Sequence, residues 1–145
     1  MSNLSDIRNG LKTVVEAAYS GFDFVVYPYE PDGVLEYPCL VVHPTEDLDY
    51  LRTPQTNDVR FRLQATLYIY IQDSVELETE MDKYRSPTGT ESLRAAVKTD
   101  DTLNGSVTYA EVVRSGQAQR GADAGQEKFW EFSSQFEIEI IKNIP

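Results

Sequence analysis

The chain has 145 residues and a formal net charge of −11 at pH 7, with 24 Asp and Glu residues against 13 Lys and Arg residues. This length fits one domain, residues 1–145, that can bury a core without a metal or a disulfide, and the single cysteine excludes an intrachain disulfide. The acidic balance disfavours tight nucleic-acid binding, which depends on Lys and Arg at phosphates. No apolar run reaches the ~20 residues of a membrane span and no signal pattern begins the chain, so we expect a soluble protein not secreted by that route.

The first element is an amphipathic helix. Its apolar residues recur at spacings of three, four and seven, and they are Leu4, Ile7, Leu11, Val14, Val15 and Ala18. Ser2 or Asn3 can cap its start, and Gly21 lies just past its end. This stripe predicts a helix packed on a sheet.

Two short strands are expected next, over residues 22–27 and 37–43, separated by a turn-prone segment rich in Pro, Asp and Gly. Cys39 lies in the second strand, in an apolar run, and is expected to be a small buried thiol. His43 ends that strand just before Pro44, and we interpret it as a strand-end histidine, since no serine or cysteine spacing links it to a catalytic motif.

The strongest pattern is an alternation over residues 59–71, VRFRLQATLYIYI, which predicts the central strand of an antiparallel sheet. One parity is apolar; the other carries Arg60, Arg62, Tyr68 and Tyr70 and faces solvent, a ligand or a neighbouring subunit. The two tyrosines fit either a second packed layer or a subunit interface. Before this strand, residues 45–58 are polar without usable periodicity, which predicts a long mobile loop.

Two further helices follow the central strand. An acidic one starts at Asp73 or Ser74 and runs through Tyr84. A short one carries Leu93, Ala96 and Val97 and starts from Thr88, with Ser86 and Pro87 as a rival start. Val107, Tyr109 and Val113 then suggest another strand.

The carboxyl-terminal part combines a polar arm with a long strand. Residues 114–128 contain no large apolar residue and are rich in Gly, Ala and Gln. This composition predicts a mobile arm. Residues 129–141 alternate, with aromatic and aliphatic residues on one face and Glu131, Glu137 and Glu139 on the other. If this strand lies beside the central one, Arg60 and Arg62 share a face with those glutamates.

The sequence shows no catalytic motif, and we expect no enzyme activity, no cofactor and no metal. His and Cys are too few for a metal site, a calcium loop lacks its glycine, and the glycines of the arm fit no phosphate-binding loop. Glu137 and Glu139 are roughly 7 Å apart by strand geometry, within reach of an acid/base pair. A small enzyme or ligand-binding domain using that face therefore stays open as the less favoured alternative.

Several short sequence segments, and the order in which they occur, resemble those of the tail terminator proteins of long non-contractile-tailed bacteriophages. These are also called tail completion or minor tail proteins. After the amino-terminal helix come residues 27–32 (YPYEPD), 37–42 (YPCLVV) and the long alternating strand. Then follow residues 81–84 (MDKY), 86–93 (SPTGTESL), a small strand, a polar arm and an aromatic last strand. The resemblance covers nearly the whole chain.

The resemblance implies an α+β subunit, with an amino-terminal helix and two further helices on a mostly antiparallel central sheet. It implies a hexameric ring at the head-proximal end of the tail tube, which stops tube polymerisation and joins the tail to the head connector or stopper protein. It places the protein in the virion, assembled in the host cytoplasm, with DNA passing through the ring without specific binding. The acidic surplus would then make the channel repel DNA.

No functional residue carries over from the family, so the expected partner contacts come from the two polar segments. They are Tyr50, Leu51, Arg52, Arg114, Gln117 and Arg120. Segments of this kind order when the partner ring is present. A head-completion or stopper neck protein is the alternative within the same class.

Overall fold

In a computed structural model of the chain, the described residues are 4–21, 23–33, 36–43, 48–52, 57–71, 74–122 and 130–143. The helices are α1 (Leu4–Ala18), α2 (Ser74–Arg85) and α3 (Leu93–Lys98). The strands are β1 (Val25–Tyr27), β2 (Cys39–Val42), β3 (Leu48–Arg52), β4 (Asn57–Ile71), β5 (Tyr109–Ser115), β6 (Gln119–Ala122) and β7 (Trp130–Asn143).

All the described strands belong to one sheet, whose main order is β1-β2-β4-β7-β5. β3 also pairs with β4, and β6 also pairs with β7. Only β1 and β2 run parallel; the other pairs are antiparallel. The α+β class with a mostly antiparallel sheet and three helices is therefore confirmed.

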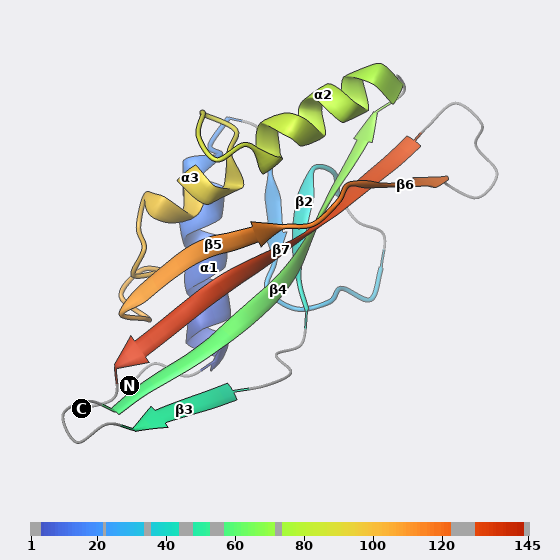
Figure 1. Cartoon of the computed structure of the whole chain (residues 1–145). Helices are drawn as coiled ribbons and strands as arrows, with labels where there is room; N and C mark the ends of the chain where they lie inside the picture. The colour runs from blue at the N-terminus through green and yellow to red at the C-terminus, as the bar shows by residue number, and fades with distance from the viewer. Residues whose placement is uncertain are drawn as a thin grey trace.

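The two longest strands, β4 and β7, form the centre of the sheet (Figure 1). Their register runs without a break from Asp58 opposite Asn143 to Ile71 opposite Trp130. The apolar parity of each strand is buried, because alternate side chains point to the same face. The buried residues on this face are Val59, Phe61, Leu63, Ala65, Leu67, Ile69, Phe136, Ile138 and Ile140.

The helices cover that apolar face, and Figure 1 shows α1 behind the strands. α1 contributes Ile7, Leu11, Val14 and Val15 to the core, as its stripe predicts, whereas Leu4 at its start is 39% exposed. Gly10 lets α1 pack against the turn before β5: a Cβ there would lie 2.2 Å from the Leu103 carbonyl oxygen.

An aromatic cluster joins α1, the start of the sheet and α2. The Tyr19 ring centroid lies 4.6 Å from that of Phe24 and 5.8 Å from that of Tyr84. The Tyr19 hydroxyl donates to the Glu91 carbonyl at 2.8 Å. Burial raises the pKa of Tyr19 and of Tyr84 well above the ordinary tyrosine value, so both hydroxyls stay protonated.

The expected start of the third helix is wrong. Ser92 caps α3: its side chain accepts from the Ala95 backbone N–H at 3.2 Å. Its hydroxyl also donates to the Ser86 carbonyl, which binds the preceding turn to the cap. Gly89, at φ 116°, breaks the helical path between Thr88 and Ser92, so the cap moves to the later serine.

The two polar segments contain strands that the sequence analysis did not expect. Within residues 45–58, β3 pairs with the first residues of β4. Within residues 114–128, β5 runs to Ser115 and β6 pairs with the start of β7. The expectation of segments without regular structure is therefore corrected at these strands. The mobility of both segments stays a prediction, and residues 44–47, 53–56 and 123–129 lie outside the described residues.

β5 also differs in which side chains it buries. Ala110 and Val112 face the core, whereas Tyr109 is half-buried and Val113 is 41% exposed. A register shift between Val112 and Arg114 interrupts the alternation.

Within the described residues, no helix is long and apolar enough to cross a membrane.

Candidate interaction surface

The first group of predicted contact residues lies at one end of the central strand pair. Tyr50, Leu51 and Arg52 are in β3, which pairs with β4 from Asn57 onwards. Their side chains lie outside the described part of the structure. The backbone therefore places this group, and nothing more is concluded about its contacts.

The second predicted group lies on the other side of the sheet. Arg114 in β5 and Gln117 after it are exposed, and Arg120 in β6 pairs in register with Phe132, with its side chain outside the described part. β6 pairs with the first residues of β7, which lie opposite the last residues of β4. The structure thus sets β3 and β6 at opposite ends of the β4–β7 pair and does not bring the two groups together.

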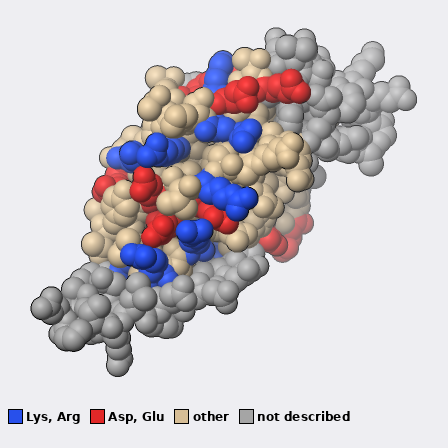
Figure 2. Space-filling view, in the orientation of Figure 1, with Lys and Arg blue, Asp and Glu red and all other residues tan. Residues whose placement is uncertain are grey.

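The outer face of the sheet carries a ladder of ion pairs, as the sequence predicts. Arg60 Nε lies 3.4 Å from Glu139 Oε1, and Arg62 Nη1 donates to Glu137 Oε2 at 3.1 Å. Figure 2 shows Lys and Arg side chains interleaved with acidic ones over this face. Tyr70 belongs to the same face, and its ring stacks on that of Tyr37 with the centroids 5.1 Å apart. This contact fits a packed layer on the outer face, and a subunit interface there stays a prediction.

The geometry of Glu137 and Glu139 bears on the alternative hypothesis of a small enzyme or ligand-binding domain that uses this face. Each carboxylate is held by a different arginine, and each side chain is 23% exposed. Opposite charges paired across neighbouring strands stabilise a sheet. This arrangement favours a structural role for the two glutamates.

A groove lies along β5, where α2 and α3 approach the strand. It has a volume of about 330 Å³, and its cationic lining residues are Arg85, Arg94 and Arg114. Arg85 Nε donates to Ser115 Oγ at 2.9 Å, and Arg94 Nη2 donates to Glu111 Oε1 at 3.2 Å. Both helices are thereby connected to β5 by an arginine.

Glu111 is the acidic residue of this groove. The Tyr109 hydroxyl donates to its Oε2 at 2.9 Å, and Arg94 bonds its other oxygen. The hydrogen bond from Tyr109, followed by that from Arg94, holds the pKa of Glu111 below its ordinary value. Arg85 and Arg94 could not be predicted as groove residues from the sequence, because residues on helices reach β5 only through the tertiary fold.

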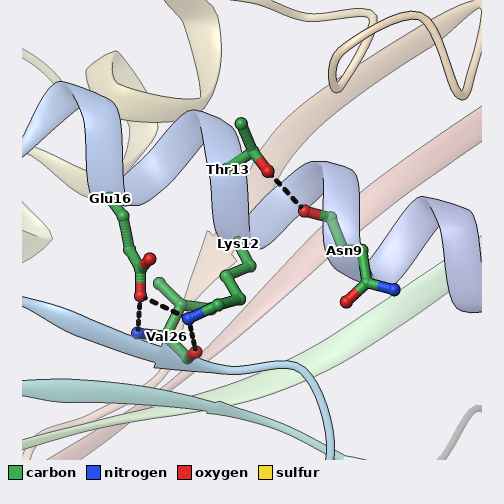
Figure 3. Close-up of polar contacts among 5 residues, drawn as sticks. All are labelled: Asn9, Lys12, Thr13, Glu16 and Val26. Carbon is green, nitrogen blue, oxygen red and sulfur yellow. Dashed lines mark hydrogen bonds and ion pairs between the residues drawn. The ribbon is translucent and has the colours of Figure 1, made fainter.

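The opposite edge of the sheet, β1, is closed by side chains of α1 (Figure 3). Glu16 Oε2 accepts from the Val26 backbone N–H at 3.0 Å, and Lys12 Nζ donates to the Val26 carbonyl at 3.1 Å. Lys12 and Glu16 also pair with each other at 2.7 Å. The backbone groups that an added strand would need at Val26 are therefore occupied.

The connection between β1 and β2 is anchored by a buried arginine. Arg8 Nη1 donates to the Pro28 carbonyl at 2.8 Å, and Nη2 donates to the His43 carbonyl at 2.9 Å. Its guanidinium lies 4.9 Å from the centroid of the Tyr29 ring. One side chain thus holds the residues that directly follow β1 and β2 to α1.

His43 follows β2 directly, as expected for a strand-end histidine, and its partners were not foreseen. Nδ1 lies 2.9 Å from Glu30 Oε1, and Nε2 lies 2.5 Å from Thr66 Oγ1. Thr66 is only 5% exposed, within β4. His43 thus links Glu30, in the connection between β1 and β2, to Thr66 in β4.

Cys39 is fully buried, as the sequence predicts. Among the described residues, no group of three or more His, Cys, Asp or Glu side chains is placed to hold a metal ion. Neither Cys39 nor the described acidic side chains therefore add a metal site to the surfaces already described.

No protein-family model matches the sequence, and no curated protein matches it. Among solved structures, the chain is similar to a chain of the structure described as the virion of native gene transfer agent (GTA) particle. The two share 11% identity with a TM-score of 0.44, over 97% of this chain and 95% of the other. A likeness of this degree does not establish a shared function.

Proposed function

We propose that the chain is a non-enzymatic structural virion protein of a tailed phage. It forms a ring, a hexamer by the family resemblance, at the head-proximal end of the tail tube. The ring stops tube polymerisation and joins the tail to the head connector, and DNA passes through it without specific binding. The resemblance of residues 27–32, 37–42, 81–84 and 86–93 to tail terminator proteins supports this proposal.

The observation that carries the proposal is the placement of β3 and β6. A subunit that connects two neighbouring assemblies needs contact segments on two separated sides of a rigid body. The continuous β4–β7 register provides such a body, and at about 3.4 Å per residue it is roughly 45 Å long. β3 and β6 lie at its two ends and carry four of the six predicted contacts, Tyr50, Leu51, Arg52 and Arg120.

The test is termination of tube growth by the purified chain and its cognate tail tube protein. Wild type should shorten the tubes and cosediment with them. Arg52→Glu in β3 should abolish cosedimentation, while Lys98→Glu, an equal charge change at an exposed residue of α3, should not. Tubes that terminate normally with variants in both β3 and β6 would contradict the proposal.

Cross-linking separates the two neck roles. A terminator should cross-link to the tail tube protein through β3 or β6, whereas a head-completion or stopper protein should cross-link only to portal-side proteins.

If the acidic surplus lines the channel, the inner wall of the assembled ring should be negative. A neutral or basic wall would contradict that part of the proposal.

A further inference from the structure

Positive and negative charge are distributed unevenly along the chain. Residues 13–51 contain eight Asp and Glu residues and no Lys or Arg. Residues 83–120 contain six Lys and Arg residues against four acidic ones, in a chain whose net charge is −11. The first stretch includes β1 and β2, and the second includes β5, so the two outermost strands of the main sheet order lie in regions of opposite charge.

The groove along β5 is the positive side of this arrangement. Arg85 and Arg94 are held in place by Ser115 and Glu111, so their guanidinium groups line the groove at fixed positions. Arg114 is exposed and forms no ion pair with the described residues. Val113 beside it is 41% exposed, which adds an apolar surface to the cationic lining.

The connection between β1 and β2 is the negative side. Glu30, Asp32 and Glu36 are all exposed. Arg8 bonds the Pro28 carbonyl, and the Glu36 backbone N–H donates to the Tyr27 hydroxyl, so the segment is held near both ends. His43 already pairs with the Glu30 carboxylate, so Asp32 and Glu36 are the carboxylates that form no ion pair with the described residues. Because Lys12 and Glu16 occupy the edge of β1, a neighbour meets this side through carboxylates and not by adding a strand.

The two sides cannot meet within one copy. β2, β4 and β7 separate β1 from β5 in the strand order, a separation of roughly 19 Å at about 4.8 Å per strand. They can meet between copies, where the cationic side of one chain faces the acidic side of the next. A head-to-tail contact of this kind builds a ring when its rotation closes.

We propose that the β5 groove lined by Arg85, Arg94 and Arg114 binds the acidic β1–β2 connection of a second copy of this chain. Asp32 of one copy meets Arg114 of its neighbour at the centre of this contact. Closure of the contact into a capping ring rests on the proposed function; the contact itself is a property of the chain alone.

The experiment measures self-association of the full chain by sedimentation velocity and native mass spectrometry. Arg114→Glu and Asp32→Lys should each weaken association at least about tenfold, since each places like charges in contact. The double variant Arg114→Glu/Asp32→Lys restores opposite charges in exchanged positions, so its association should return to near that of wild type. Added salt should weaken wild-type association.

Two matched controls separate this contact from a general effect of charge. Lys98→Glu changes the net charge as Arg114→Glu does, at an exposed residue outside the groove lining. Asp82→Lys, on α2, matches Asp32→Lys. Both should associate like wild type, and circular dichroism should show every variant folded.

A wild type that stays monomeric at its highest soluble concentration overturns the proposal. So does an Arg114→Glu chain that associates like wild type, or a double variant that stays as weak as the single ones. A chain that self-associates through these residues but leaves tail tubes unaffected would refute the proposed function and leave this contact standing.

Discussion

The Glu16 carboxylate on α1 accepts a hydrogen bond from the Val26 backbone N–H in β1 at 3.0 Å. Lys12 completes the arrangement at the Val26 carbonyl. A helix thus supplies both a donor and an acceptor to an outermost strand that pairs only with β2 among the described strands. An edge treated in this way resists pairing with other chains.

Replacing Glu16 tests this arrangement. Glu16→Ala leaves the Val26 N–H without its partner and Lys12 without its counter-charge, so the free energy of unfolding should fall by about 1–2 kcal/mol. Urea denaturation measures this. Thr13→Ala is the control, since the exposed Thr13 hydroxyl bonds only the Asn9 carbonyl of its own helix at 3.0 Å, and its effect should stay within about 0.5 kcal/mol.

Gly10→Ala should destabilise the protein although alanine is the better helix former. The new Cβ would lie 2.2 Å from the Leu103 carbonyl oxygen and 2.9 Å from Ser106 Oγ. Moving α1 away from this turn should cost about 2 kcal/mol or more, against a helix-propensity gain of about 1 kcal/mol. Thermal unfolding of Gly10→Ala and of Gly33→Ala, where a Cβ meets open space, provides the comparison. Equal stability of the two variants would contradict the close packing.

The Arg62–Glu137 pair should contribute little to stability. The Arg62 side chain is 57% exposed, and ion pairs with this degree of exposure are weakened by solvent. A double-mutant cycle with Arg62→Met and Glu137→Gln should give a coupling energy below about 1 kcal/mol, and added salt should reduce it. A coupling above about 2 kcal/mol would mean that this face is more shielded than the exposures indicate.

Glu111 should make stability depend on pH. Because its pKa is lower in the folded chain than the ordinary value of 4.5, its ionised form stabilises the fold. That contribution is complete above pH 4.5 and is lost as the pH falls through the lower folded value. Glu111→Gln should therefore lower stability at pH 7, and its difference from wild type should shrink in acid.

Two further variants identify the cause of this dependence. Tyr109→Phe removes the hydrogen bond that lowers the pKa of Glu111 most, and Arg94→Met removes the next. Each should reduce the pH-dependent part of the stability, measured by urea denaturation across acid pH. A dependence left unchanged by both would assign it to other carboxylates.

The parts of the fold that could be predicted were those with strong periodicity. The alternation around Leu63 and Ile138 identified the two central strands, and the stripe through Leu11 identified the first helix. Burial on one face requires apolar residues at a regular spacing, so these elements can be recognised from the sequence alone. The ion pairs of Arg60 and Arg62 followed once the two strands were placed side by side.

The parts that were missed depend on partners far along the chain. β6 reads Gln-Arg-Gly-Ala, with no pattern of its own, and forms by pairing with β7. β3 likewise has no pattern of its own and forms by pairing with residues 57–61, at the start of β4. The predicted contact residues in these segments remain predictions. The β5 groove was missed because Arg85 and Arg94 come from two helices.

The antiparallel register of β4 and β7 also has a mechanical consequence. β3 adjoins the first residues of β4, and β6 adjoins the first residues of β7, at opposite ends of the pair. Tension applied through these two ends pulls the strands along their length, so it loads the crosswise hydrogen bonds in shear, together, instead of unzipping them one after another. The subunit should yield least in the direction that joins its two ends.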